Sequence, residues 1–337
     1  MRENHIKFIK HIRTHQFWGN RLINNDSSKG VFIPKNEIQN NFFPYPKFNI
    51  NDELKYLISL NEIEISSTTL KNGNMMFLYK AKKSGSIDLG MIKNNSNPLD
   101  STTKKMMNYL NLISLPEDAP STLYFDTFLF YRKYNLELFF TVDKFSGRVH
   151  TPVSSFHRTH RPNILINNER TISFDVATMQ PLLLAKILRN QIGKNDFTSW
   201  IESGLDVYEL LKSKLNLEQR DDAKKKFFEI LFSHPNNKLA ESFGNAKWIE
   251  WINEFKSKPF EQNPHSIEKN HSDLAYLLQS IEVNLMRQLW NKLIENDIVF
   301  LSVHDEIIVP IKDEVKAFEL FNNLLKNEFP YYKINSK

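Results

Sequence analysis

The chain of 337 residues contains no cysteine, which excludes disulfide bonds and thiolate metal sites. It has only nine glycines, and neither the GxxxxGK[ST] nor the GxGxxG phosphate-binding pattern occurs in it. No apolar run approaches the roughly 20 residues that span a bilayer, and the start lacks the apolar core of a secretory signal. We therefore expect a cytoplasmic protein without a membrane partner.

Hydrophobic residues make up 41% of the sequence, enough for a sizeable core in one large domain or two ordinary ones. Lysine and arginine exceed aspartate and glutamate by 44 − 39 = 5, and the isoelectric point is near 9.0. This surplus suits a polyanionic partner, although an ordinary basic surface has the same balance.

Two regions of different character follow each other along the chain. Residues 1–120 combine a basic helical start, a strand over 74–83 and polar connectors such as 93–103. The segment 121–147 is aromatic and predicts strands, with a turn at its end. We therefore expect an N-terminal region over 1–120, for which a thumb-like role is one option, and a core over 121–337.

Hydrophobic periodicity predicts the order of elements in this core. A strand is expected at 171–176, followed by a helix whose first turn contains Pro181. Ser272 or Asp273 is the expected N-cap of a long amphipathic helix over 272–296. Further helices are expected at 206–215, at 218–233, in AKWIEWINEF and in VKAFELFNNLLKN.

The segment FLSVHDEIIVP contains His304, Asp305 and Glu306 between two β-branched runs. These flanks predict a tight hairpin with the polar residues at its tip. An aspartate there suits Mg²⁺, which needs a second carboxylate or a substrate phosphate as well. The alternatives are a solvated acidic turn and the His-Asp pair of helical metal-dependent phosphohydrolases, but the β-branched flanks argue against the latter.

A second carboxylate lies in a matching setting. Asp175 ends the predicted strand TISFDV just before a helix, and it can meet Asp305 only if the two strands are neighbours in one sheet. Such a pair could hold two Mg²⁺ ions about 4 Å apart, with Mn²⁺ as a substitute, for an in-line displacement at phosphorus. The alternative for Asp175 alone is a helix N-cap.

The predicted helix over 218–233 carries a stripe of cations and aromatic residues. Arg220, Lys224 and Phe228 follow at intervals of four residues, and Phe232 extends the stripe. Spread over about 18 Å, the two cations could lie along a triphosphate and a ring against the sugar and base. The alternative is a solvated lysine-rich helix with Phe227 and Phe228 in the core.

In this order the segments resemble the polymerase core of family A DNA polymerases. SFDVATMQPLLLA resembles the first palm motif, with Asp175 as the metal ligand. RDDAKKKFFEILF matches the fingers-helix pattern Arg-x3-Lys-x7-Tyr-Gly in register, with Phe232 at the tyrosine position. VHDE matches the last palm motif residue for residue.

Three further segments extend the resemblance to about residues 140–325. SGRVHTPVSSFHRTHRPNI is similar to the Gly-Arg-Leu-Ser-Ser segment, which implies that Arg148 contacts backbone phosphate and that Arg161 binds nucleic acid. GLDVYELL resembles the segment before the fingers helix. LLQSIEVNLM resembles the helix whose glutamine, here Gln279, contacts the minor groove.

The resemblance implies an α+β fold, with a palm of antiparallel sheet and helices, helical fingers at about 190–270 and a small N-terminal region. The implied activity is a DNA-directed DNA polymerase that extends a primer-template with dNTPs, without a proofreading domain. Asp175 and Asp305 would hold the metals, with His304 and Glu306 positioning the primer terminus and the metal site. For the nucleotide, the implied contacts are Arg220, Lys224, Phe228, Phe232 and Gln180.

Departures from the family pattern leave two alternatives open. Gln180 stands where the family has a glutamate that helps to exclude a 2′-hydroxyl, and Ser233 stands where it has glycine. A neutral Gln180 would tolerate a ribose, so an RNA polymerase, primase or template-independent tailing enzyme using RNA or rNTPs is the first alternative. A nucleic-acid-binding protein that has lost catalysis is the second.

Overall fold

The computed structural model describes most of the chain after residue 137 and parts of it before. The longer described stretches are 49–60, 62–71, 74–81, 97–119, 138–235, 246–263 and 270–337, and the shorter ones are 4–5, 7–9, 11–12, 31–34, 38–39, 41–43, 125, 128–129, 132, 241, 243 and 266.

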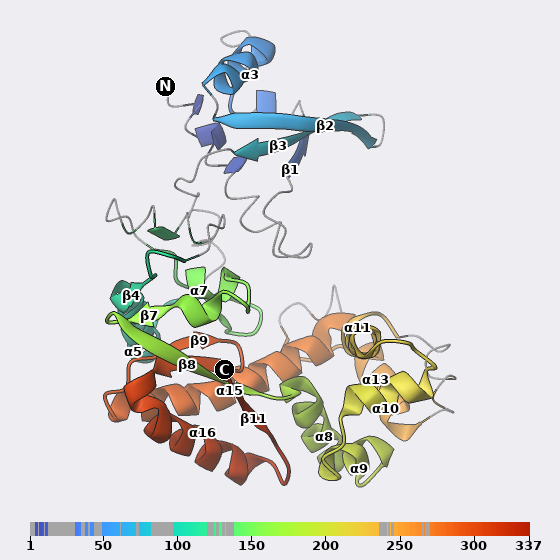
Figure 1. The fold of residues 1–337 in the computed structure, drawn as a ribbon. Helices are drawn as coiled ribbons and strands as arrows, with labels where there is room; N and C mark the ends of the chain where they lie inside the picture. Colours follow the sequence, from blue (N-terminus) through green and yellow to red (C-terminus); the bar gives the residue numbers. More distant parts are fainter. Residues whose placement is uncertain are drawn as a thin grey trace. The chain divides into compact units, whose positions relative to one another are not determined.

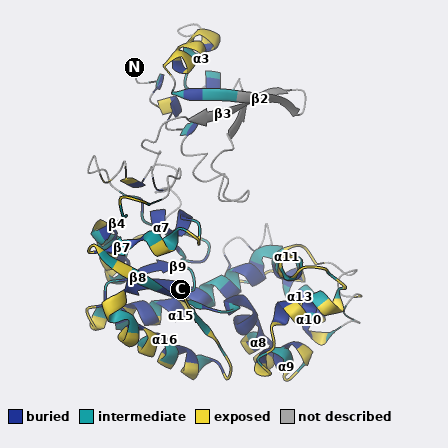
Figure 2. Cartoon of the chain, viewed as in Figure 1, coloured by how far each residue is buried: buried dark blue, intermediate teal, exposed yellow. Residues whose placement is uncertain are grey.

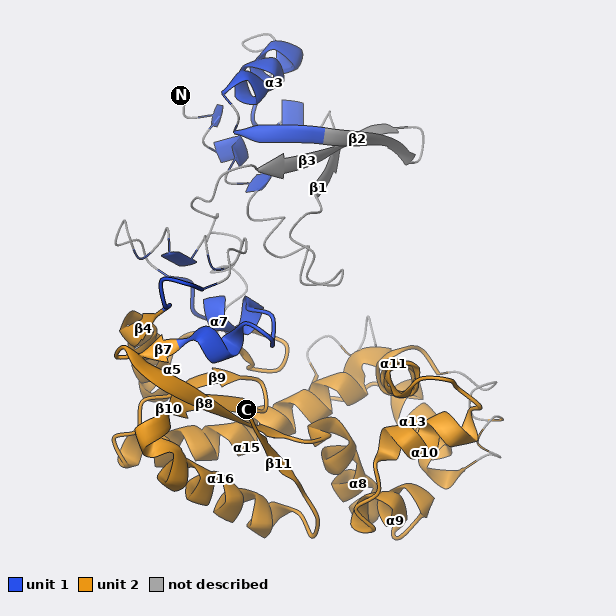
Figure 3. Cartoon of the chain, viewed as in Figure 1, with its two compact units in different colours: residues 1–96, 115–141, 150–164 blue, residues 97–114, 142–149, 165–337 orange. Residues whose placement is uncertain are grey.

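The chain divides into two compact units, coloured separately in Figure 3. Unit 1 comprises residues 1–96, 115–141 and 150–164, and unit 2 comprises 97–114, 142–149 and 165–337. The chain therefore enters unit 2 before residue 120 and returns to unit 1 twice. The expected organisation into residues 1–120 and 121–337, with fingers at about 190–270, stays a prediction.

Unit 1 contains a small antiparallel sheet in the order β1-β3-β2. The strand expected over 74–83 is present as β3 (Asn74–Ala81), and β1 (Val31–Pro34) and β2 (Ile63–Lys71) flank it. Helix α3 (Ile50–Ser59) begins at Asn49, whose side chain accepts a hydrogen bond from the backbone N–H of Asn51. The described residues between 4 and 12 are helical, as expected. Later in the unit, α7 spans Pro152–Ser155.

The aromatic segment 121–147 differs from the strand prediction, which is wrong for its described middle. Phe125, Phe128, Leu129 and Arg132 have helical backbone, and the strand is confined to β5 (Thr141–Val142), which pairs with β6 (Val149–His150). Phe125 and Phe128 are three residues apart and at most 2% exposed, so they share one buried helical face. Burial of this face overrides the strand propensity of aromatic residues. The rest of 120–137 lies outside the described residues.

Unit 2 is built on a mostly antiparallel sheet in the order β4-β7-β8-β10-β9 (Figure 1). Its central strand β8 pairs with β10 over most of its length, with β7 at its start and with β11 at its end. The strands are β4 (Ile113–Ser114), β7 (Leu165–Ile166), β8 (Glu169–Val176), β9 (Leu301–Val303), β10 (Glu306–Pro310) and β11 (Ile334–Ser336).

Helices make up the rest of unit 2, and every helix expected there from the sequence is present. The polar connector predicted at 93–103 instead ends in α5, because Asp100 caps this helix by accepting from the backbone N–H of Thr103. The helices are α5 (Ser101–Tyr109), α8 (Met179–Ile192), α9 (Asp196–Glu202), α10 (Val207–Lys214), α11 (Arg220–Phe232), α13 (Lys247–Ser257), α15 (Asp273–Glu295) and α16 (Glu314–Glu328).

Two buried charged side chains hold the helical part of unit 2 together. Lys256, on α13, is 1% exposed and donates hydrogen bonds to the carbonyls of Ile230 and Ser233 at the end of α11. Asp273 is fully buried and accepts from the backbone N–H of Phe260 and the hydroxyl of Ser266. Burial lowers the pKa of Lys256 to about 8.

The expected α+β class is confirmed, because an antiparallel sheet is combined with helices. The helices α8 and α15 have long buried stretches on the faces that they turn to their neighbours (Figure 2). In the described part of the chain, no helix has both the length and the apolar character needed to cross a bilayer.

Candidate active site

The two aspartates singled out in the sequence are brought together by the pairing of β8 with β10. Asp175 is the Cα partner of Glu306, the residue that follows Asp305. Antiparallel partners have Cα atoms about 5 Å apart, and consecutive residues lie about 3.8 Å apart. The Cα atoms of Asp175 and Asp305 are therefore within about 9 Å of each other.

The register also fixes the face of the sheet on which the acids lie. Phe174 is the partner of Ile307, and its ring contacts that of Phe318 on α16 with centroids 5.6 Å apart. Because side chains alternate between the two faces of a strand, Asp175 and Glu306 point away from α16. Glu306 is buried and Asp175 is 24% exposed, so Asp175 can reach solvent from this face.

Asp305 lies at the centre of a cluster of charges. Its pKa is raised to about 8: burial is the largest cause, and the negative charges of Glu282 and Asp175 add to it. A backbone hydrogen bond and the cation of Arg148 oppose the rise. Three carboxyl groups thus share a region with one arginine, and a cation bound among them would favour their ionised forms.

Glu282, on α15, forms a buried network that the sequence did not reveal. Its side chain is 2% exposed and accepts hydrogen bonds from Arg148 Nε at 3.0 Å and Nη2 at 2.7 and 2.9 Å. Gln180 Nε2 donates to the same carboxylate at 2.5 Å. Burial raises the pKa of Glu282, against the opposing effect of Arg148 and Gln180. Arg148, expected at backbone phosphate, is therefore bound to a carboxylate here.

The other end of the Gln180 amide has an unused acceptor. Gln180 is 8% exposed, and within the described residues its Oε1 atom has no hydrogen-bond partner. Leaving a buried amide oxygen without a hydrogen-bond donor costs about 1–3 kcal/mol of free energy. A ligand that donated a hydrogen bond to this oxygen would recover that free energy on binding. Glu282, which Gln180 contacts, acts electrostatically on Asp305, and the unused acceptor therefore belongs to the same site.

Strand β11, which the sequence did not predict, covers Asp175. Asn335 is the Cα partner of Asp175, and its Nδ2 donates to Asp175 Oδ1 at 3.1 Å. Lys337 Nζ lies 2.5 Å from Asp175 Oδ2. Both carboxylate oxygens therefore have a donor from β11.

The helices α10 and α11 bring a cation and a phenol towards this cluster. Arg220 Nε donates to Asp206 Oδ2 at 2.8 Å, and its guanidinium lies 4.8 Å from the ring centroid of Tyr208. Tyr208 is buried, and its pKa is raised, first by burial and then by the charges of Asp206 and Asp305, with Arg220 opposing. Because the charge of Asp305 raises the pKa of Tyr208, the first turn of α10 lies close enough to the hairpin for an electrostatic interaction.

The remaining stripe residues on α11 differ from one another in exposure. Lys224 is exposed, whereas Phe228 and Phe232 are half-buried and stack with ring centroids 5.5 Å apart. Phe227, by contrast, is fully buried and stacks against Phe197. The alternative was a solvated lysine-rich helix with Phe227 and Phe228 in the core. Of these two rings, Phe227 lies in the core, whereas Phe228 does not.

Left-handed backbone occurs next to both aspartates. Thr178, between β8 and α8, has φ of 61°, and His304, the first residue of the two-residue hairpin loop, has φ of 58°. The other non-glycine residues with positive φ in the described part are asparagine or aspartate, which tolerate it. A β-branched residue such as Thr178 in this region is an outlier, so the turn that aims Gln180 is strained.

Gln279 and Arg161 were both expected to bind nucleic acid. Gln279 is half-buried on α15, one helical turn before Glu282, and Arg161 donates to the carbonyl of Phe156 within unit 1. Their roles at nucleic acid stay predictions. Glu282, Asn335, Lys337 and Tyr208 were missed. Only Glu282 left a signal, as an acidic residue inside an apolar stretch.

The donor set fits a divalent cation that is also held by substrate. Carboxylate oxygens are hard ligands that suit Mg²⁺ and Mn²⁺, and the excess of acid around Asp305 supplies the negative charge. Among the described residues, no three histidine, aspartate or glutamate side chains form a ready-made metal site. Asp175 and Asp305 would therefore depend on phosphate oxygens and water to complete the coordination.

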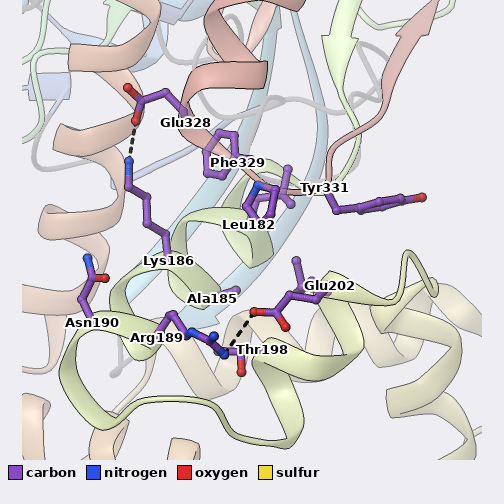
Figure 4. Close-up of a pocket in the computed structure, with 12 residues that line it drawn as sticks. Leu182, Ala185, Lys186, Arg189, Asn190, Thr198, Glu202, Glu328, Phe329 and Tyr331 are labelled. Atoms are coloured by element: carbon purple, nitrogen blue, oxygen red, sulfur yellow. Dashed lines mark hydrogen bonds and ion pairs between the residues drawn. The ribbon is translucent and has the colours of Figure 1, made fainter.

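A separate cavity of about 110 Å³ lies between α8, α9 and the segment 328–331 (Figure 4). Leu182, Ala185 and Phe329 line it, together with the ion pair of Arg189 and Glu202. Neither Asp175 nor Asp305 lines this cavity, so it is distinct from the charge cluster.

Comparison of the chain with models of known protein families gave no match, and comparison with curated protein sequences gave none. The case for a function therefore depends on the residues and their geometry.

Proposed function

We propose that this protein is a nucleotidyltransferase that depends on Mg²⁺ and extends a nucleic acid 3′ end with dNTPs, as a DNA-directed DNA polymerase of the family A type. The observation that supports it most directly is the pairing of β8 with β10, which brings the Cα atoms of Asp175 and Asp305 within about 9 Å of each other. The positive net charge and the absence of a bilayer-crossing helix in the described part are compatible with a nucleic-acid partner in the cytoplasm.

In this proposal Asp175 and Asp305 hold the cations. When bound, two such ions would activate the attacking oxygen and stabilise charge on the leaving pyrophosphate. Arg220 and Lys224 bind the triphosphate, and Arg220 is held ready by Asp206 and by the ring of Tyr208. The stacked pair of Phe228 and Phe232 offers an aromatic surface to the sugar and base.

Three other residues complete the proposed site. The ring of His304, at the hairpin tip, and the carboxylate of Glu306 position the primer terminus and the cation ligands. Arg148 acts through Glu282, whose charge it offsets beside Asp305, and is thus a positioning residue.

The unused acceptor of Gln180 favours a second candidate, incorporation of ribonucleotides by an RNA polymerase, a primase or a tailing enzyme. A deoxyribose has no 2′-hydroxyl, whereas a ribose 2′-hydroxyl could donate to Gln180 Oε1. A glutamate at this position would place a negative charge beside the ribose 2′-hydroxyl, whereas Gln180 is neutral.

The decisive experiment is primer extension with purified full-length protein. We expect incorporation with Mg²⁺ on a primed template, none with EDTA, and at least a thousandfold loss in Asp175→Asn and Asp305→Asn. The matched control is Asp297→Asn, which changes an exposed aspartate with φ of 55° that asparagine adopts equally well. Parallel reactions with rNTPs, and without primer or template, separate the two candidates.

Wild-type activity in Asp175→Asn or Asp305→Asn would contradict the metal assignment. Binding of DNA without incorporation under any of these conditions would favour a nucleic-acid-binding protein that lacks catalysis.

A further inference from the structure

Strand β11 and the residue after it place two side chains against the carboxylate of Asp175, which the proposed function assigns to a cation. Asn335 donates to one oxygen of Asp175 and Lys337 approaches the other, at 3.1 and 2.5 Å. An ammonium group beside a carboxylate satisfies the same electrostatic demand as a metal ion. The two cations therefore compete for Asp175 Oδ2.

The backbone of β11 is held firmly at this point, but the lysine side chain is not. Ser173 and Lys337 exchange two backbone hydrogen bonds, of 2.9 and 3.0 Å, and the backbone N–H of Ala177 donates to the carbonyl of Lys333 at 2.9 Å. The side chain of Lys337 is 48% exposed. Its ammonium can thus swing into solvent without any movement of the strand.

Asn335 differs from Lys337 in burial and in charge. It is half-buried, lies directly across from Asp175 in the ladder and donates a hydrogen bond without carrying charge. A neutral donor on one carboxylate oxygen fixes the plane of the group and leaves its charge available to a metal.

We propose that β11 is part of the cation site: Asn335 orients the Asp175 carboxylate, and the Lys337 ammonium occupies its free oxygen until a divalent cation displaces it. This inference depends on the proposed function only in assigning Asp175 as a cation ligand. Lys337 sets the cation concentration at which the site fills, and Asn335 sets its intrinsic affinity.

The test is a titration of the full-length protein with Mn²⁺, without nucleotide, in which electron paramagnetic resonance measures the free ion. Lys337→Ala should bind Mn²⁺ about two- to fivefold more tightly, because an exposed ion pair is a weak competitor. Asn335→Ala should bind about tenfold more weakly, as for the loss of a residue that orients a metal ligand. Lys316→Ala, which removes an exposed lysine from α16, should leave the affinity unchanged.

Lys337→Gln serves as a second variant if Lys337→Ala lowers the melting temperature. Unchanged or weaker Mn²⁺ binding in both Lys337 variants would overturn the competitor role, and unchanged binding in Asn335→Ala would overturn the orienting role. Wild-type binding in Asp175→Asn would instead remove the metal assignment itself, so the two failures are distinguishable.

Discussion

Replacing Arg148 by methionine should destabilise unit 2 by about 3–5 kcal/mol at pH 8, the cost of leaving one member of a buried ion pair without its partner. Among the described residues, Glu282 would keep only Gln180 as a donor, at a position where its side chain is 2% exposed. For a unit of this size, 1 kcal/mol corresponds to about 2–4 °C, so the melting temperature should fall by roughly 6–20 °C.

The loss should depend on pH in a defined direction. Burial already raises the pKa of Glu282, and removal of the Arg148 cation raises it further. Between the unfolded and the folded pKa the native state holds a proton that the unfolded state has lost, so stability falls as the pH rises through this range. The carboxyl of the variant becomes protonated as the pH falls through this range, so the difference from wild type should be smaller at pH 5 than at pH 8.

Thermal unfolding followed by circular dichroism at pH 5 and pH 8 measures both effects. The matched control is the double variant Arg148→Met with Glu282→Gln, which leaves no charge at either position and should recover stability at pH 8 with little dependence on pH. A fall of less than about 2 °C in Arg148→Met at pH 8, or an equal fall at both pH values, would contradict the assignment of a buried ion pair between Arg148 and Glu282.

Three further predictions concern the framework of unit 2. The pKa of Lys256 is about 8 in the folded chain, and its ordinary value is 10.5. Between these pH values the unfolded state binds a proton that the folded state has lost, so the free energy of unfolding should rise by about 3 kcal/mol as the pH rises. Urea unfolding should show this rise in the wild type but not in Lys256→Met. Asp273→Ala removes the acceptor of a buried backbone amide and a serine hydroxyl and should cost about 3 kcal/mol by urea unfolding, whereas Asp297→Asn, at an exposed position, should cost far less. Gly204 has φ of 74°, and a Cβ there would lie 2.6 Å from the ring of Tyr331, so Gly204→Ala should lower the melting temperature by several degrees and Gly193→Ala, which meets nothing within 4 Å, by less.

The central hairpin and its neighbouring strand could be predicted because their signals are local. Two β-branched runs separated by two residues leave few alternatives to a hairpin, and β9 and β10 form at the expected place. Strand β8 and helix α8 follow from apolar alternation and from Pro181. The meeting of Asp175 with the hairpin then followed from placing both strands in one sheet.

The contacts that complete the site could not be predicted because they join distant parts of the chain. Arg148 and Glu282 are 134 residues apart, and no local pattern marks one as the partner of the other. Strand β11 is short and polar, with Asn335 and Ser336 in its three residues, so it lacks the alternation that identifies a strand. In 121–147, aromatic composition favoured strands where Phe125 and Phe128 lie on a buried helical face.

The left-handed residues Thr178 and His304 carry a consequence for directed evolution. Glycine or asparagine would adopt these backbone angles at a lower free-energy cost at either position. For a β-branched residue such as Thr178 the difference is about 1–2 kcal/mol. Selection for heat resistance alone should therefore replace them early, whereas selection that also demands the proposed nucleotidyl transfer should retain them. Sequencing the survivors of the two regimes would show whether these turns are kept for folding or for chemistry.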